Sequence, residues 1–249
     1  MNIDSILSPA ELPALARRDL RGTVCVVFDV LRATSTFVTA LHQGAKEIFP
    51  VSEIAEAVAI RQRQPDVLLA GERDGVRIRA AQSGGIDFDF GNSPREFTAA
   101  AVRGKTIVST TTNGTRALRA CAGAKKVLAA SFLNLTATAD FLHAEKEILL
   151  VCAGTGDGVA MEDVRAAGAL AELLTAREDA RPTLSEATET ARQGFAKLQT
   201  DIATSIGMTK NGRRLLAIPE LRDDVAFCAQ RDVFKLAAEM QPDGGLRGK

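Results

Sequence analysis

The sequence predicts an α/β protein with three layers, α/β/α, around a mostly parallel sheet, followed by a more helical C-terminal portion. Short apolar runs alternate with helix-like stretches up to residue 180, as is typical of a parallel sheet covered by helices on both faces. Several runs are apolar throughout, as expected for strands buried on both sides. After Pro182 the sequence becomes mainly helix-like. We therefore expect an α/β core over 1–180 and a helical portion over 181–249 packed on it, or one continuous domain.

Six runs in the core have the composition of buried strands. Most are rich in Val, Ile and Leu, and helix-like sequence separates them. Strands of this kind run parallel when a helix connects each to the next. The expected strands are TVCVVFD (23–29), EIFPV (47–51), VLLA (67–70), TIVST (106–110), KVLAA (126–130) and EILLVCA (147–153).

The helices between these strands begin at residues with capping chemistry. Ser52 can cap SEIAEAVAIRQRQ, and Ser93-Pro94-Arg95-Glu96 has the form of a capping box with proline at the first helical position. Asn134 or Thr136 can open the helix NLTATADFLHAE, and residues 162–176 are strongly amphipathic.

Besides the helix-like region after Pro182, one other region departs from the strand–helix alternation. Residues 71–93 are glycine-rich and form a long connection for a compact domain, so we predict a functional role for this loop. The tail 242–249, PDGGLRGK, is expected to be frayed.

The overall charge argues against broad classes of partner. Thirty-one Lys and Arg residues balance thirty-one Asp and Glu residues, so no net field would draw the protein to nucleic acid or to an anionic membrane. Residues 1–19 contain no long apolar run, and we expect neither a secretory signal nor a membrane span there. Any preference for an anionic ligand must therefore be local. The sequence leaves open whether the protein forms a homo-oligomer.

The four cysteines indicate a reducing environment. Cys25, Cys121, Cys152 and Cys228 form no CxxC pair, and two of them lie inside expected strands. Small core residues explain this pattern better than a zinc site or disulfides. We therefore expect a cytoplasmic protein with unpaired cysteines.

Polar side chains follow most of the expected strands. In an open parallel sheet, ligands bind outside the carboxyl ends of the strands. Each polar residue there also has an ordinary structural explanation, since Asp29 could cap a helix and Asn113-Gly114 could form a tight turn. Their occurrence after five strands makes a common site the better explanation. The segments are 29–36 (DVLRATST), 71–73 (GER), 111–115 (TTNGT), 131–134 (SFLN) and 154–158 (GTGDG), the last followed by Glu162 and Asp163.

The residue types at these strand ends suit phosphoryl-group chemistry. His42 and His143 both fall within helical patterns, and no nucleotide-binding glycine loop is present, so a Ser-His-Asp triad and a nucleotide site are disfavoured. Carboxylates are ligands that Mg²⁺ prefers, arginines such as Arg32 and Arg73 match phosphate or sulfonate oxygens, and threonines with backbone amides can cradle an anion. A carboxylate-bound metal facing an anion site suits phosphate ester cleavage.

Several sequence blocks resemble those of the 2-phosphosulfolactate phosphatase family. In order, they are VVFDVLRATSTFVTAL, AGERDG, FGNSPREF, KTIVSTTTNGTRAL, ASFLN and ILLVCAGT followed by EDVRAAG, with weaker similarity in NGRRL and DDVAFCAQRD. The resemblance implies a three-layer α/β/α fold and Mg²⁺-dependent hydrolysis of 2-phospho-3-sulfolactate, a small phosphorylated, sulfonated acid, to 3-sulfolactate and phosphate. It also implies a place in coenzyme M biosynthesis.

The resemblance also implies roles for individual residues. Asp29, Arg32 and Glu72 are expected to be catalytic. The metal ligands are expected to be Asp29 and Glu72, with Glu162 and Asp163 as further candidates. The substrate is expected to contact Arg73, Asn92, Ser93, Thr111, Thr112, Asn113 and Gly114, where Gly114 would let the backbone approach an oxyanion. Asn211 stands where the family usually has a histidine, so a role that depends on that histidine is not expected here.

Three alternatives stay open at this point. The attacking group could be water or Asp29 itself. The substrate could be a different small phosphorylated acid, since Arg73, Arg77 and Arg79 could bind a sulfonate or a carboxylate equally well. The protein could also be a non-catalytic anion-binding module, although anion binding alone does not need several carboxylates nearby.

Overall fold

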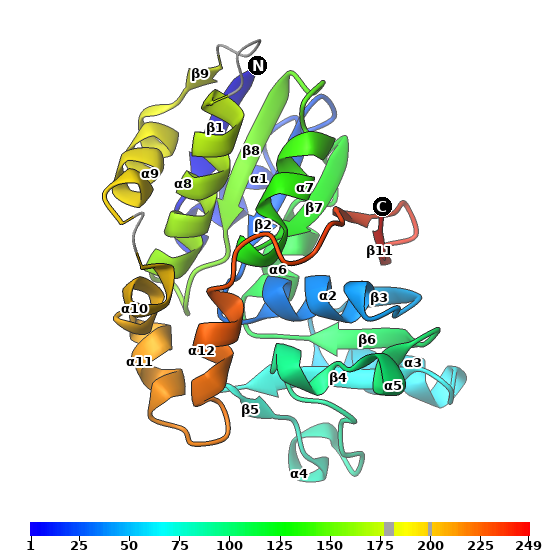
Figure 1. Ribbon diagram of the computed structural model, residues 1–249. Helices are drawn as coiled ribbons and strands as arrows, with labels where there is room; N and C mark the ends of the chain where they lie inside the picture. The colour runs from blue at the N-terminus through cyan, green and yellow to red at the C-terminus, as the bar shows by residue number, and fades with distance from the viewer. Residues whose placement is uncertain (177–181, 199–200) are drawn as a thin grey trace.

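The computed structural model describes residues 1–176, 182–198 and 201–249. Within these residues, eleven strands form one sheet in the order β5-β4-β6-β3-β11-β10-β7-β2-β8-β1-β9, with helices on both faces, which confirms the three-layer α/β/α prediction (Figure 1). The strands are β1 (Asn2–Ile6), β2 (Val24–Phe28), β3 (Glu47–Pro50), β4 (Leu68–Arg73), β5 (Val76–Arg77), β6 (Thr106–Thr110), β7 (Lys126–Ala130), β8 (Glu147–Cys152), β9 (Thr183–Leu184), β10 (Ala238–Met240) and β11 (Leu246–Gly248).

The six expected strands are all present, as β2, β3, β4, β6, β7 and β8. Residues of β2 show why such runs are continuously apolar. Val26 and Phe28 pack in one hydrophobic cluster, whereas Cys25 and Val27 pack in the cluster on the opposite face of the sheet. Both faces of the strand are therefore covered, and no position along it is left for a polar side chain.

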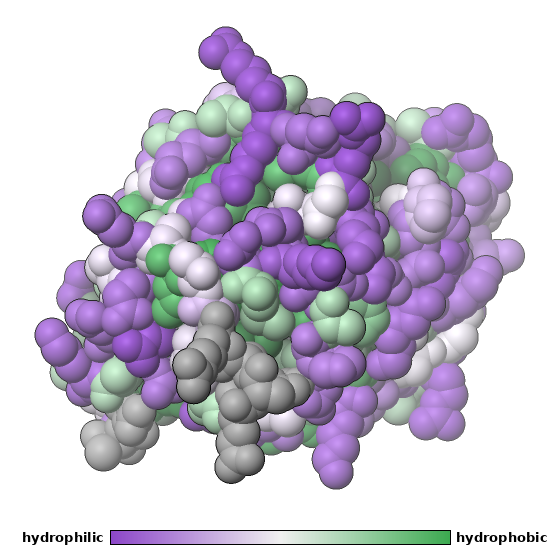
Figure 2. Space-filling view, turned by 90° about the horizontal axis from the view of Figure 1, so that it is seen from above, coloured by the Kyte–Doolittle hydropathy of each residue, from purple (hydrophilic) through white to green (hydrophobic). Residues whose placement is uncertain are grey.

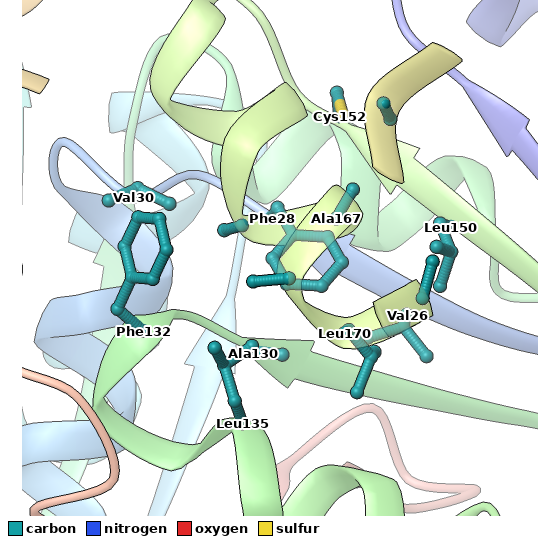
Figure 3. Packing of buried hydrophobic residues seen from close by; sticks show 14 of the residues in the cluster. Val26, Phe28, Val30, Ala130, Phe132, Leu135, Leu150, Cys152, Ala167 and Leu170 are labelled. Carbon is teal, nitrogen blue, oxygen red and sulfur yellow. The ribbon is translucent and has the colours of Figure 1, made fainter. Parts of the chain in front are cut away.

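The helices are distributed over both faces of this sheet. One cluster joins β2 to α7, α8 and α9, where Phe28 lies among Ala130, Ala167 and Leu170 (Figure 3). The other joins β2 to α1, α2 and α6, and a smaller cluster lies between α3 and the β4–β6 pair. The helices are α1 (Leu12–Leu15), α2 (Ala33–His42), α3 (Ile54–Arg63), α4 (Ala80–Ser83), α5 (Ala99–Val102), α6 (Gly114–Ala120), α7 (Leu135–Phe141), α8 (Met161–Thr175), α9 (Glu186–Ala196), α10 (Ile202–Gly207), α11 (Lys210–Leu216) and α12 (Arg222–Cys228), with short 3₁₀ turns at Pro9–Glu11, Pro94–Glu96 and Phe132–Asn134.

The sheet consists of two parallel sets joined by a C-terminal hairpin. β4, β6 and β3 are parallel to one another, as are β7, β2, β8, β1 and β9. Between them lies the β10–β11 hairpin, antiparallel to β7 on one side and to β3 on the other. Because three successive pairings reverse direction, the two parallel sets run in opposite directions along the sheet. The tail expected to be frayed is therefore part of the sheet, and that prediction is wrong.

The sheet is strongly bent where the hairpin meets the first set. A single residue pair, Leu246 with Ile48, joins β11 to β3. In Figure 1 the arrowheads of β4 and β6 and that of β8 point toward one region, which α10, α11 and α12 border. The bend thus brings the carboxyl ends of both sets together, although a single parallel rim was expected from the sequence.

Two expected helix caps have other partners. Ser93 gives no cap hydrogen bond to its 3₁₀ turn, because its Oγ donates to Asp224 over 2.7 Å. Glu53 rather than Ser52 occupies the N-cap of α3, without a side-chain cap bond. The capping box predicted at residues 93–96 is therefore wrong, and tertiary contacts take its place.

The surface is mainly hydrophilic in the view from above the end that carries β1 and β9 (Figure 2). Among the described residues, no helix is both long and apolar enough to cross a membrane. All four cysteines are buried and unpaired, as expected.

Candidate active site

A cavity of about 270 Å³ lies where the carboxyl ends of the two strand sets meet. The loops after β2, β4, β6 and β8 supply one part of its wall, and α11 supplies another. This is the position expected for a ligand site from the sheet topology. The lining residues are Asp29, Leu31, Arg32, Glu72, Asp74, Gly75, Asn92, Thr112, Asn113, Gly154, Thr155, Gly156, Lys210, Asn211, Arg214 and Leu215.

Asp29 directly follows β2 and is a buried carboxylate of the lining. The N–H of Ala33, the first residue of α2, donates to its Oδ1 over 3.1 Å. Burial raises the pKa of Asp29 to about 7, against the lowering effect of the Ala33 N–H. The nearby charges of Glu72 and Glu162 raise that pKa further, and the charge of Arg32 lowers it. Near neutral pH this carboxyl can therefore change protonation or accept a cation.

Gly114 fixes the position of the Asp29 side chain. A Cβ at residue 114 would lie 2.6 Å from Oδ2 of Asp29 and 2.6 Å from Cβ of Ala33. Real Cβ atoms essentially never approach other atoms so closely. The glycine is therefore required because the side chain of Asp29 packs against it, and not only because an oxyanion could approach its backbone.

We expect Gly114→Ala to reduce kcat about 100-fold, since small displacements of a reacting group have effects of this size. It should also lower the free energy of unfolding by about 1–3 kcal/mol through overpacking. Steady-state kinetics and urea unfolding would measure the two effects. Gly123→Ala is the matched control, because a Cβ at residue 123 would have no neighbour within 4 Å. Wild-type kcat in the Gly114→Ala protein would show that Asp29 does not depend on this contact.

Glu72 ties the end of β4 to the turn after β6. Its Oε1 accepts hydrogen bonds from the backbone N–H and the Oγ1 of Thr112, each over 2.9 Å. Its Oε2 accepts the Gly75 N–H over 2.7 Å. Both carboxylate oxygens are thus occupied, and Glu72 holds the long loop against the TTTNGT segment.

Asp163 and Glu162 are neighbours in the first turn of α8 but have different surroundings. Asp163 accepts the Val30 N–H over 2.8 Å and the Gly154 N–H over 3.0 Å, so it links the ends of β2 and β8. Burial raises the pKa of Asp163 well above its ordinary value, and the charges of Asp29 and Glu162 act in the same direction. Oε1 of Glu162 accepts a hydrogen bond from Asn211 over 2.6 Å. Its Oε2 is buried and has no hydrogen-bond partner among the described residues.

Arg32 is held in a buried ion pair. Its Nη1 donates to Oδ2 of Asp224 over 2.7 Å, and its Nη2 donates to the Gly75 carbonyl over 2.6 Å. Oδ1 of Asp224 accepts the Ser93 hydroxyl over 2.7 Å. The Arg32 side chain is 3% exposed and that of Asp224 is 0% exposed. Arg32 therefore borders the cavity while its charge is largely neutralised by α12.

Four of the seven predicted substrate-binding residues, Arg73, Ser93, Thr111 and Gly114, do not line the cavity. Nη2 of Arg73 donates to Oγ1 of Thr110 over 3.0 Å, on the β6 side of the loop. Thr111 exchanges hydrogen bonds with Thr115 in the first turn of α6. Ser93 is bonded to Asp224 as described above. Arg73, Ser93 and Thr111 thus contact other protein groups, and Gly114 packs against Asp29 as described above.

Asn92, Thr112 and Asn113 do line the cavity. Nδ2 of Asn113 donates to the carbonyls of Ala153 and Gly156, each over 3.1 Å, and so connects the loop after β6 to the loop after β8. Asn113 is therefore partly engaged in holding the wall of the cavity. Thr112 is exposed, and its hydroxyl donates to Glu72.

Sequence reasoning missed the contribution of the C-terminal helices to this site. Asp224 lies in the DDVAFCAQRD block and Asn211 in the NGRRL block. Both blocks have only weak similarity to the family, and Asn211 drew notice only as a replacement of the usual histidine. Asn211 donates to Glu162 and also to Oγ1 of Thr155, over 2.5 Å, so this position does face the site. Lys210 and Arg214 also line the cavity and are not among the predicted site residues. The i, i+4 spacing of these two cations on one helix was the signal available in the sequence.

The acidic residues do not form one compact ligand set. Among the described residues, no group of three or more His, Cys, Asp or Glu side chains is arranged so that it could hold a metal ion. Glu72 and Asp163 have both oxygens bonded to protein donors. Glu162 and Asp163 are buried and do not line the cavity. The buried oxygens left for a cation include those of Asp29 and the unpartnered Oε2 of Glu162, while Asp74 offers an exposed carboxylate at the cavity. Hard oxygen donors of this kind suit Mg²⁺, which commonly takes one or two carboxylates and completes its shell with water and phosphate oxygens.

The histidines lie away from this chemistry, as expected. The ring of His42 stacks on Phe234 with 4.1 Å between centroids, and His143 is exposed. Neither lines the cavity.

Comparison with known proteins gives one consistent result. The family model described as 2-phosphosulpholactate phosphatase matches residues 9–242. A protein of Thermotoga petrophila named "Probable 2-phosphosulfolactate phosphatase" is 39% identical over 210 residues, which cover 84% of this chain and 86% of that protein. Proteins with the same name from Caldanaerobacter subterraneus subsp. tengcongensis and Clostridium novyi are 37% identical over 230 residues (90% of each chain) and 31% identical over 241 residues (96% and 97%).

Proposed function

The chain belongs to the 2-phosphosulfolactate phosphatase family, and from this premise we propose that it hydrolyses 2-phospho-3-sulfolactate to 3-sulfolactate and phosphate. The observation that carries the proposal is the cavity itself. It joins a buried carboxylate whose pKa is raised to about 7 to two basic side chains of α11. A cavity with acidic and basic walls suits the cleavage of an ester that bears several negative charges.

We propose that Mg²⁺ is the cofactor and that Asp29 and Glu162 hold it. The buried, unpartnered Oε2 of Glu162 supports this assignment, because a buried polar atom without a partner is costly unless a ligand satisfies it. When bound, Mg²⁺ would neutralise charge on the phosphate oxygens. Glu72 and Asp163 are assigned to positioning, since their oxygens are occupied by backbone donors.

The remaining residues of the site orient the reacting groups. Ala33 and Gly114 fix Asp29 on two sides. Glu72 holds Thr112 at the cavity edge, and Asn113 holds the loop after β8. The Arg32–Asp224 pair places a guanidinium beside the cavity in one orientation. Such prearranged groups lower the cost of organising the site during the reaction.

Two routes of attack on phosphorus are compatible with this arrangement, through water or through the Asp29 carboxylate. Trapping with beryllium fluoride separates them. An adduct bonded to Asp29 in a crystal structure would support attack by the carboxylate. A beryllium fluoride group that is free of Asp29 would support attack by water.

The proposed activity is tested by phosphate release from 2-phospho-3-sulfolactate, with Mg²⁺ present or removed by EDTA. We expect turnover that requires Mg²⁺ and a higher kcat/KM than for other phosphate monoesters. Higher activity on a different phosphorylated acid would replace the substrate but keep the chemistry. Binding of phosphate and Mg²⁺ without turnover of any ester would instead support an anion-binding module.

The binding of Mg²⁺ should depend strongly on pH between 6 and 8. Because the pKa of Asp29 is raised from its ordinary 3.8 to about 7, the folded protein keeps a proton that the unfolded chain releases above pH 4. The contribution of Asp29 to the free energy of unfolding of the metal-free protein therefore falls as pH rises from 4 toward 7.

Mg²⁺ must displace the proton of Asp29, so the apparent Kd of Mg²⁺ should be about tenfold lower at pH 8 than at pH 6. Thermal shift titrations with Mg²⁺ at the two pH values would show it, and Asp29→Asn should weaken binding at both.

We further propose that the enzyme works in the reducing cytoplasm, which its four buried, unpaired cysteines suit. Its place in coenzyme M biosynthesis stays a prediction from the family resemblance.

A further inference from the structure

Lys210 and Arg214 lie one turn apart on α11, and both line the cavity. Side chains at i and i+4 share a helix face. Both residues are exposed. Among the described residues, neither forms an ion pair with an acidic side chain, whereas the charge of Arg32 is already paired with Asp224. Lys210 and Arg214 are therefore the cations of the cavity wall that stay available to a ligand.

Side-chain and backbone contacts hold α11 in place beside the strand ends. Asn211 donates to Thr155 and Glu162, which fixes the first turn of the helix against the loop after β8 and the start of α8. Gly212 is buried against α10, where a Cβ would lie 2.0 Å from the Ile206 carbonyl oxygen. The helix that carries the two cations is thus fixed through Asn211 to Glu162, one of the two carboxylates proposed to hold the metal.

The distribution of charge across the cavity suggests that its two sides bind different groups of the substrate. The acidic side, with Asp29 in the lining and the buried Glu162 near it, is suited to the phosphate only through a bound cation. The basic side, α11, can meet negative groups directly. The proposed substrate carries a carboxylate and a sulfonate beside its phosphate, and these groups do not react.

We propose that Lys210 and Arg214 bind the non-reacting anionic groups of the substrate and so select esters that carry a carboxylate or sulfonate besides the phosphate. This inference rests on the proposed function. Neither residue is required for the cleavage step itself, so their removal should act on selection among esters. The energy of such contacts, remote from the reacting atoms, can contribute to kcat as well as to KM.

The test combines three single variants with four esters. Lys210→Met and Arg214→Met remove a charge but keep an unbranched side chain that suits a helix. Arg213→Met is the matched control, since Arg213 is exposed on the same helix and does not line the cavity. The esters are 2-phospho-3-sulfolactate, 2-phospholactate, which lacks the sulfonate, the phosphate ester of 2-hydroxyethanesulfonate, which lacks the carboxylate, and ethyl phosphate, which lacks both.

For Lys210→Met and Arg214→Met, we expect kcat/KM on 2-phospho-3-sulfolactate to fall about tenfold each and about 100-fold together, the size of a lost charge-assisted contact. On ethyl phosphate the change should be less than about twofold. The two partly truncated esters show which group each cation binds, because a variant should lose activity only on esters that retain its partner. Arg213→Met should match the wild type on all four.

Equal losses on ethyl phosphate and on the sulfonated ester would overturn the inference, because the cations would then bind the phosphate. Unchanged kcat/KM on every ester would overturn it as well. Failure of the proposed function is seen separately, in the wild-type protein, as an absence of turnover on 2-phospho-3-sulfolactate. Circular dichroism and thermal unfolding of each variant would confirm that the helix and the fold are retained.

Discussion

Replacement of Asp29 by asparagine should reduce phosphate release by about 10³-fold or more and leave the protein folded. Asparagine keeps the shape of the side chain and can still accept the Ala33 N–H through its carbonyl oxygen. It removes the negative charge that both proposed routes of attack require. The measurement is kcat with saturating Mg²⁺ and substrate, accompanied by thermal unfolding.

The same variant should lose activity without losing stability, which gives a second test. Burial raises the pKa of Asp29 to about 7, which means that the charged form is disfavoured inside the protein. In EDTA at pH 8, the Asp29→Asn protein should therefore be at least as stable as the wild type. Asp74→Asn is the control, because Asp74 lines the same cavity but is exposed. Near-normal turnover by the Asp29→Asn protein would contradict the placement of the reaction at the end of β2.

Replacement of Asp224 by alanine should lower the free energy of unfolding by about 3–5 kcal/mol, since it leaves the buried Arg32 guanidinium without its counter-charge. The Ser93 hydroxyl loses its acceptor in the same variant. Urea unfolding would measure the effect. Activity should fall as well, because Arg32 borders the cavity and would no longer be held in one orientation.

The neighbouring residue provides the control for this experiment. Asp223 also carries a carboxylate and pairs with Arg95 over 3.3 Å, but its side chain is 69% exposed. Asp223→Ala should therefore change the free energy of unfolding by less than about 1 kcal/mol. An Arg32→Met, Asp224→Leu double variant should recover much of the stability lost in Asp224→Ala, because no unpaired charge stays buried. A small effect of Asp224→Ala would show that water reaches Arg32 and replaces the lost partner.

The sequence was sufficient to place the strands of the core and the polar segments that follow them. Each of these features is local, since an apolar run predicts a buried strand and the residue after it lies at the sheet edge. The bend of the sheet could not be predicted in the same way. It depends on β10 and β11, which are three residues each and pair with strands more than a hundred residues away in the sequence.

The candidate site was predictable to a similar extent. Asp29, Glu72, Asn92, Thr112 and Asn113 line the cavity as expected, because they directly follow or end core strands or lie in the long loop. Arg73 follows Glu72 in β4, and successive side chains of a strand point to opposite faces. With Glu72 at the cavity, the Arg73 side chain contacts Thr110 instead. The residues of α11 and α12 could not be placed, since nothing local indicates which part of the core a C-terminal helix covers.

The position of the β10–β11 hairpin has a consequence for biosynthesis. Its residues leave the ribosome after those of all the other strands, yet they occupy the middle of the sheet. The two strand sets can each pair within themselves during translation, but until the hairpin is inserted they expose strand edges to each other and to other chains. Unpaired edges of this kind are templates for aggregation. The interval between the synthesis of β8 and that of β11 is therefore the stage at which a nascent chain of this protein would depend most on chaperones.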